Sequence, residues 1–142
     1  LCHRYLIVRS AWVYGIGRDF VSTVLNAAAD PTCPWLAVPT DRFASPTSAD
    51  DLTAAVEQLI DHDTLGIYHI VCQGRCSRYD FAQAILKAAH MEDKLELHPI
   101  RAADAGSTPS YTVLDNLMLR LDNLPQPRPW KEALNEYINS LQ

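Results

Sequence analysis

The sequence of 142 residues predicts an α/β fold in which helices alternate with strands, some of them parallel. Three observations lead there. Residues 4–10, "RYLIVRS", form an apolar run rich in β-branched residues that does not alternate with polar ones, which is typical of a strand buried on both faces. Amphipathic patterns of helical period follow it and separate it from further short apolar runs. Each of the first three helical patterns starts at a Ser or an Asp that can cap a helix.

In the first half of the chain, residues 19–29 predict a helix that Asp19 caps. A short strand is expected over residues 35–39, after two prolines that end the helix. Residues 40–52 are expected to form a loop, which leads into a second helix over residues 48–62 with Ser48 as its cap. The apolar stripe of the first helix is expected to comprise Phe20, Val24, Leu25 and Ala28.

In the second half, residues 66–71 predict a strand and residues 76–90 a helix, in which Ser77 and Asp80 have nearly the spacing of a capping box. Residues 95–100 alternate and contain a proline, as an edge strand would. The remaining expected elements are a loop at 101–110, an extended piece at 111–116, a short helix at 117–122, a rigid connector at 125–129 and a closing helix at 130–142. That last helix would bury Trp130, Ala133, Leu134, Tyr137 and Leu141.

The amino-acid composition argues against several classes of protein. The formal net charge is −5 and no basic run occurs, which argues against nucleic acid as a partner. No apolar stretch reaches the roughly 18 to 20 residues that span a membrane, and no signal-peptide pattern precedes Leu1. We expect a cytoplasmic protein with reduced thiols at Cys2, Cys33, Cys72 and Cys76. No further ligands at zinc spacing accompany the last two, so no metal site is predicted.

Several blocks together carry a resemblance: "YLIVRSAWVYGIGRDFV", "DRFASPTSADDL", "GIYHIV" and "CSRYDFAQAIL". The chain resembles the carboxyl-terminal half of the dTDP-4-dehydrorhamnose reductase family, in the sugar-nucleotide-binding branch of the extended short-chain dehydrogenases. The resemblance implies one substrate-binding domain over residues 1–142, part of an NAD(P)-binding Rossmann-like fold. The family's glycine-rich turn and Tyr-x-x-x-Lys pair would precede it. Neither Tyr5 nor Tyr79 is followed four residues later by Lys, so no catalytic residue is expected here.

The resemblance also assigns binding residues. It implies contacts to the nucleotide sugar from Trp12, Tyr14, Phe20, Arg42 and Pro46, and contacts to the cofactor from Ser10 and Ala11. Trp12 follows the first strand, where ligands of open α/β sheets bind, and an aromatic ring there can stack on a sugar. The alternative is that Trp12 is a core residue that caps the sheet.

Three positions raise alternatives. Asp19 stands where the family usually has Asn, and we interpret it as a helix cap rather than a ligand contact. Arg42 stands where reductases commonly have Gln; it suits pyrophosphate, or it is a surface residue paired with Asp41 or Asp51. This departure widens the expected substrates to dTDP-sugars or other nucleotide sugars. Asp50 matches an acid that some relatives use at a magnesium-bridged dimer contact, but one acid does not make a magnesium site.

The resemblance implies that an intact parent uses NADPH or NADH to reduce dTDP-4-dehydro-L-rhamnose to dTDP-L-rhamnose. This chain alone is expected to be inactive and to need no cofactor. The alternative is a non-catalytic binding or regulatory module that resembles the β subunit of methionine adenosyltransferase. Residues 5–9 would normally be covered by the other half of such a protein, so their apolar surface is expected to be exposed or self-paired, with dimerisation or strand exchange through it.

Overall fold

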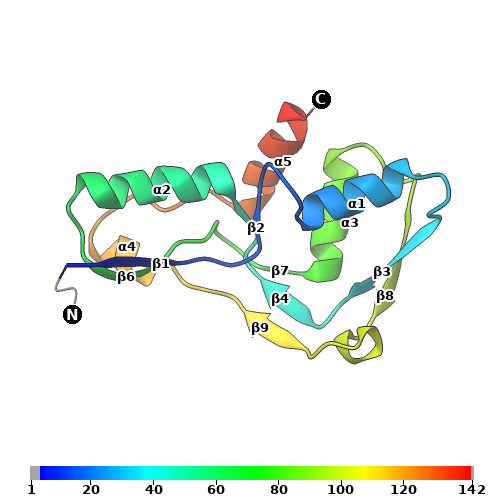
Figure 1. The fold of residues 1–142 in the computed structure, drawn as a ribbon, viewed down its shortest axis with the longest axis horizontal. Helices are drawn as coiled ribbons and strands as arrows, with labels where there is room; N and C mark the ends of the chain where they lie inside the picture. The colour runs from blue at the N-terminus through cyan, green and yellow to red at the C-terminus, as the bar shows by residue number, and fades with distance from the viewer. Residues whose placement is uncertain (1–3, 142) are drawn as a thin grey trace.

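The computed structural model describes residues 4–141. Its helices and short strands alternate along an elongated molecule, with β1, β6, α2 and α4 at one end and α1, α3, β3 and β8 at the other (Figure 1). All the strand pairs except β4–β7 are parallel, which confirms the predicted α/β class with parallel strands.

One end of the molecule, which we call the β1–β6 region, is a two-stranded parallel sheet. β1 (Leu6–Arg9) pairs with β6 (Gly66–His69), and α2 (Ala49–Asp61) and α4 (Leu117–Leu121) pack with it. Buried there are Ala55, Leu59, Tyr68, Ile70, Leu119 and Leu124, against which Leu6 and Val8 pack. The opposite face is open, since Ile7 is 46% exposed. The prediction that this strand is buried on both faces is therefore wrong, because helices among residues 4–141 cover one face only.

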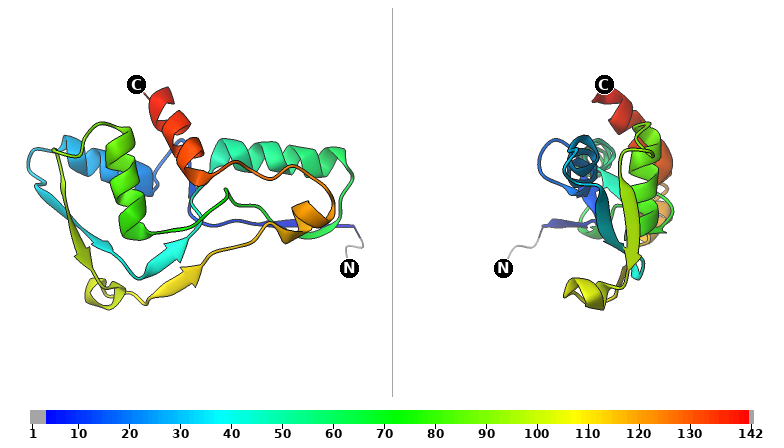
Figure 2. Two further views of the ribbon diagram at one scale, coloured as in Figure 1. Left: turned by 180° about the vertical axis from the view of Figure 1, so that it is seen from behind. Right: turned by 90° about the vertical axis from the view of Figure 1, so that its right-hand side faces the viewer.

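The other end, which we call the α3 region, surrounds its central helix. α3 (Arg78–Ala88) contacts α1 (Phe20–Ala29), α5 (Trp130–Ser140) and the parallel pair β3 (Trp35–Pro39) and β8 (Glu96–Ile100) (Figure 2). The core includes Val21, Val24, Phe81, Ile85 and Leu134. The strand at β8 pairs only with β3 in the described chain, as an edge strand would.

Short strands join the two ends. β4 (Arg42–Ala44) lies between β7 (Cys76–Ser77) and β9 (Ser110–Thr112), while β2 (Val13–Tyr14) pairs with β5 (Thr47–Ser48). A 3-10 turn, η1 (Ala102–Ala105), precedes β9. Within the expected loop over residues 40–52, residues 42–44 and 47–48 are therefore paired strands, and residues 49–52 already belong to α2. These ladders bring the segment around Arg42 against the start of α3.

The helix starts match the sequence. Asp19 caps α1 by accepting from the Ser22 amide at 2.8 Å. Ser48 caps α2, and Ser77 and Asp80 form a capping box on α3. α5 differs at its end: Ile138 is buried while Leu141, expected in the apolar stripe, is 54% exposed.

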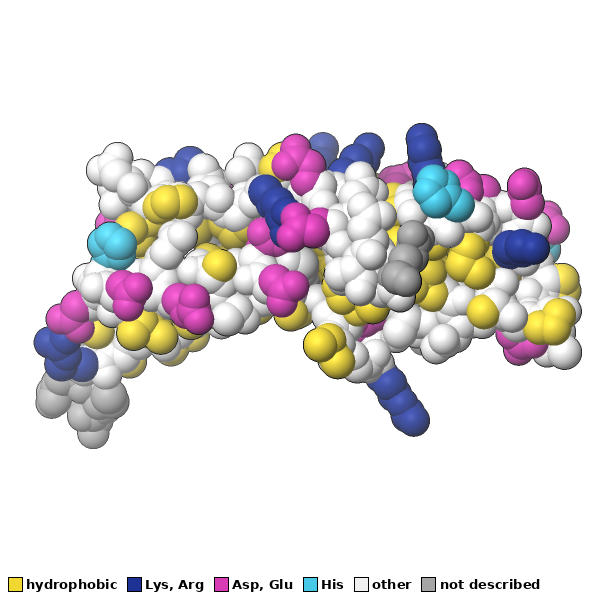
Figure 3. Space-filling view, turned by 90° about the horizontal axis from the view of Figure 1, so that it is seen from above, with side chains coloured by type: hydrophobic (Ala, Val, Ile, Leu, Met, Phe, Trp, Pro, Cys, Tyr) yellow, Lys and Arg dark blue, Asp and Glu magenta, His cyan; other side chains and the backbone are white. Residues whose placement is uncertain are grey.

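Charged side chains of both signs are interspersed on the face shown in Figure 3. Within residues 4–141, no helix has the length and hydropathy needed to cross a membrane. The same residues include no group of three or more His, Cys, Asp or Glu side chains that could hold a metal ion. Cys33, Cys72 and Cys76 are free thiols, whereas Cys2 lies outside the described residues.

Candidate functional site

The loop that follows β1 lies at the carboxyl end of a parallel strand, which is where open α/β sheets bind ligands. Ser10 and Ala11 begin this loop. The Ser10 hydroxyl is buried and has no hydrogen-bond partner within residues 4–141. A buried hydroxyl without a partner is costly, so Ser10 is a candidate for a bond to a bound group.

Trp12 is held in a strained backbone conformation. Its φ of 43° is in the left-handed region, which bulky residues rarely adopt and which costs about 1–3 kcal/mol. Its indole is half-buried and stacks on Phe81, with 6.2 Å between ring centroids. Trp12 therefore packs at the edge of the core, and its contact to a sugar stays a prediction.

The arginine at the start of α3 covers these rings. The guanidinium carbon of Arg78 lies 3.7 Å from the centroid of the Trp12 indole and 4.4 Å from that of the Phe20 ring. Such short distances place the cation over the ring faces. Phe20 in turn stacks on Phe81 at 5.8 Å. Burial, and then the positive charge of Arg42, lower the pKa of Arg78 to about 10.

Arg42 reaches the same place from β4. The β4–β7 register pairs Phe43 with Ser77, so one residue further along each segment Arg42 and Arg78 stand opposite one another. The Arg42 Nε lies 3.4 Å from the Ser110 hydroxyl, to which it donates. Neither arginine forms an ion pair with a carboxylate within the described chain.

The alternative for Arg42, an ion pair with Asp41 or Asp51, is wrong. The Asp41 carboxylate accepts from the amide of Ala102 at 2.8 Å. Asp51 instead pairs with Arg128, with 3.0 Å between Oδ1 and Nε. Arg42 therefore keeps a charge that no acid of residues 4–141 neutralises.

Tyr14 and Pro46, the other two residues expected at the substrate, are buried. Tyr14 is 2% exposed and packs edge-on against Tyr137, with 5.3 Å between ring centroids. Its hydroxyl has no hydrogen-bond partner in the described chain, and burial raises the pKa of Tyr14. Pro46 is buried between β4 and β5. Their contacts to a substrate stay predictions, since in this structure both side chains pack within the protein.

The loop that carries Trp12 is anchored from two sides. A Cβ at Gly15 would lie 2.8 Å from the Cβ of Ala49, so only glycine fits this close approach to α2. The Tyr137 hydroxyl on α5 donates to the Gly15 carbonyl oxygen at 2.6 Å. The Gly15 amide donates to Asp19 at 2.8 Å, so the residue that caps α1 also holds the loop.

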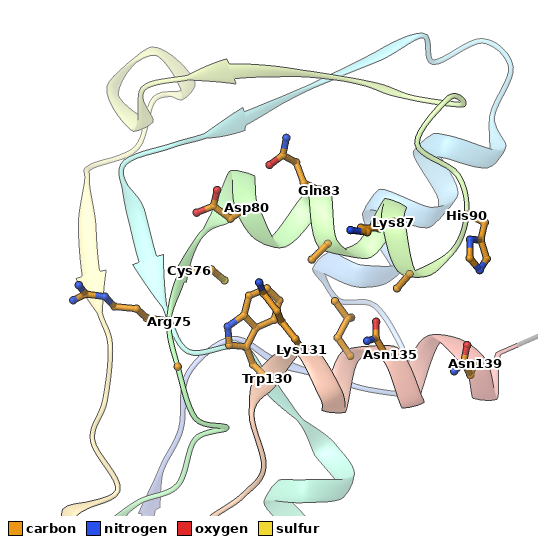
Figure 4. Close-up of a pocket in the computed structure, with 14 residues that line it drawn as sticks. Arg75, Cys76, Asp80, Gln83, Lys87, His90, Trp130, Lys131, Asn135 and Asn139 are labelled. Carbon is orange, nitrogen blue, oxygen red and sulfur yellow. The ribbon is translucent and has the colours of Figure 1, made fainter.

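A separate cavity of about 920 Å³ lies between α3 and α5 (Figure 4). Its lining includes Gln83, Lys87, Lys131 and Asn135. Gln83 and Lys87 follow Arg78 by five and nine positions on α3. At 3.6 residues per turn, both spacings place a side chain on nearly the opposite face of the helix from Arg78. This cavity is therefore distinct from the cluster around Trp12.

Sequence reasoning missed Arg78. Its partners come from the loop before α1, from α1 itself and from β4, which are far away in sequence. One local signal exists. A cation in the first turn of a helix opposes the positive end of the helix dipole, so an arginine directly after the cap Ser77 is an unfavourable choice for stability alone.

Comparison with known proteins shows which family the chain matches. The RmlD substrate binding domain family matches residues 1–142. The spore coat polysaccharide biosynthesis protein SpsK of Bacillus subtilis is 38% identical over 134 residues, which cover 93% of this chain and 46% of SpsK.

Crystal structures extend the likeness to the fold. A dTDP-4-dehydrorhamnose reductase of Clostridium acetobutylicum superposes with a TM-score of 0.90 at 39% identity, over 97% of this chain and 49% of that one. The enzyme of Bacillus anthracis, solved in complex with NADP, gives a TM-score of 0.90 at 30% identity and covers 99% and 49%.

The chain thus spans about half the length of these relatives. Its whole length matches one family model, and its fold matches family members at high similarity. The chain belongs to the RmlD substrate binding domain family, homologous to the dTDP-4-dehydrorhamnose reductases.

Proposed function

We propose that this chain is the nucleotide-sugar-binding part of an NADPH-dependent dTDP-4-dehydrorhamnose reductase, and that residues 1–142 form its single substrate-binding domain. One observation carries the proposal: Trp12 and Arg42 converge on the same cluster at the carboxyl end of β1. A nucleotide sugar needs an apolar face for a sugar or base and cations for its diphosphate. Family membership supports the same assignment.

Each residue of the cluster has a role in this proposal. Trp12 and Phe20 provide aromatic surface that orients the sugar and excludes water. Arg42 offers its planar fork of donors to the diphosphate, and its charge is free for that purpose. Tyr14 and Pro46 shape the wall behind them, because both are buried.

The cofactor would meet this chain at Ser10 and Ala11. The buried Ser10 hydroxyl without a partner fits a hydrogen bond to such a group. When bound, a reduced nicotinamide supplies hydride to the 4-keto carbon of the sugar. Residues of this chain bind and orient the sugar, whereas the family's phosphate-binding glycine turn and Tyr-x-x-x-Lys pair do not occur in the 142-residue sequence.

Calorimetry and a spectrophotometric assay test the proposal together. The 142-residue chain should bind dTDP-L-rhamnose and should not oxidise NADPH with dTDP-4-dehydro-L-rhamnose. A longer product of the same gene that includes a Tyr-x-x-x-Lys pair should catalyse that oxidation. Turnover by the pure 142-residue chain, or a chain with no affinity for dTDP-L-rhamnose, would overturn the proposal. A longer product that binds the ligand without turnover would support the non-catalytic binding module instead.

A further inference from the structure

Arg78 stands in an environment that is unfavourable for a cation in three respects. It is largely buried, which disfavours its charged form. It faces Arg42 across the β4–β7 register, where like charges repel. It also occupies the first residue of α3, at the positive end of the helix dipole. A bound anion would relieve all three effects at once.

The aromatic rings hold the Arg78 guanidinium in place without using its hydrogen-bond donors. Its guanidinium carbon lies 3.7 Å from the centroid of the Trp12 indole and 4.4 Å from that of the Phe20 ring, so both rings pack against the guanidinium. The N–H groups of a guanidinium point outward in its own plane, where ring contacts do not satisfy them. No hydrogen bond joins Arg78 to another side chain or to a backbone oxygen within residues 4–141. Its donors are therefore available to a ligand.

We propose that Arg78 binds the diphosphate of the nucleotide sugar together with Arg42, held in position by Trp12 and Phe20. This inference rests on the proposed function, from which it takes the ligand to be a nucleotide sugar. Two opposed arginines match the oxygens of a diphosphate, because each fork can donate two parallel hydrogen bonds to one phosphate. The indole of Trp12 then has a second task, which is to position the arginine that covers it.

Titration of the purified chain with inorganic pyrophosphate and with thymidine diphosphate, by calorimetry at low salt, tests this inference. Arg78→Gln should weaken binding of both by about tenfold to a hundredfold, the usual loss for charged hydrogen bonds. Arg78→Lys keeps the charge but loses the fork, so its affinity should be intermediate. Arg78→Met keeps an apolar side chain that can pack on the rings but removes the charge. It therefore tests the role of the charge if the Gln variant does not fold.

Arg75→Gln is the matched control. It removes the same charge three residues away, from an exposed arginine that already donates to the Tyr111 hydroxyl. It should change either dissociation constant by less than about twofold, because screening weakens an exposed charge. Equal losses of affinity in the Arg75 and Arg78 variants would show that only the overall positive charge of the protein matters, and they would overturn the role of Arg78.

The remaining outcomes separate this inference from the proposed function. If thymidine diphosphate binds equally well to the wild type and to folded Arg78→Met, the role of Arg78 is refuted while the proposed function stands. If pyrophosphate binding depends on Arg78 but dTDP-L-rhamnose does not bind, the diphosphate site stands and the proposed function fails. If neither pyrophosphate nor thymidine diphosphate binds to the wild type, the inference is refuted.

Discussion

The β1–β6 region and the α3 region bury their apolar residues in different ways. In the α3 region, the helices α1 and α5 and the strands β3 and β8 all pack around α3. In the β1–β6 region, the core lies on one face of a two-stranded sheet, while Tyr5, Ile7, Leu65 and Ile67 remain exposed. The α3 region is thus closed by residues of this chain, whereas the β1–β6 region has a face that residues 4–141 leave open.

The largest expected effect is the difference in stability loss between an isoleucine variant in the α3 region and one in the β1–β6 region. Ile85→Ala, at a fully buried site on α3, should lower the free energy of unfolding by about 2–5 kcal/mol. Ile7→Ala, on the open face, should cost less than about 1 kcal/mol. Urea denaturation followed by circular dichroism measures both. Similar losses would show that the face of β1 is covered in solution.

Trp12→Ala should have the next largest effect, on binding rather than on folding. Loss of the aromatic contact, and of the platform under Arg78, should weaken binding of thymidine diphosphate by about 1–3 kcal/mol. Alanine keeps the positive φ and therefore its strain, but Trp12 is only partly buried against the core, so the melting temperature should fall less than it does for Ile85→Ala. A stability loss of about 3–5 kcal/mol, with unchanged affinity in the folded fraction, would instead make Trp12 a core residue.

Alkaline pH should weaken the α3 region. Burial raises the pKa of Cys72 to about 11 and that of Cys76 to about 12, above the ordinary value of 9.0. The unfolded chain therefore loses these protons first, and stability should fall as the pH rises from about 9 to about 11, by at most about 1.4 kcal/mol per pH unit for each thiol. Urea midpoints across this range measure the decline. Cys76→Ala should flatten the slope, and an unchanged slope would contradict this assignment.

The smallest effect concerns self-association through the open face. Ile7 and Ile67 are paired in the β1–β6 register and both are exposed. We expect the 142-residue chain to dimerise or exchange strands there, weakly because the face is small. Sedimentation equilibrium should show it, and the double change Ile7→Lys with Ile67→Lys should abolish it. A monomer at all concentrations would contradict the expectation.

The features that could be predicted from the sequence are those that depend on neighbouring residues, such as the helix caps. Asp19, Ser48 and Ser77 cap helices because their side chains bond to amides within three residues. The strands β4 and β7 escaped prediction because two or three residues give no period to detect, whereas β9 overlaps the extended piece that was expected over residues 111–116. Their pairing depends on partners far away in the sequence.

The site shows the same limit. Trp12, Phe20 and Arg42 were expected at one site from a family resemblance, and the structure brings all three to Arg78. Arg78 itself was missed because its setting exists only once α1, α3 and β4 have assembled. The wrong prediction that β1 is buried on both faces has a related cause. An apolar run indicates that a strand is buried, but it does not indicate which part of the protein covers each face.

The bond from Tyr137 to the Gly15 carbonyl joins residues that are 122 positions apart. A contact of such range forms late, because closing a long loop is entropically costly. During synthesis, which proceeds from the amino terminus, the segment that carries Trp12 leaves the ribosome long before α5 does. It cannot acquire its final tether until α5 has been translated. A message truncated before residue 130 would yield a polypeptide with capped early helices and an unanchored Trp12 loop.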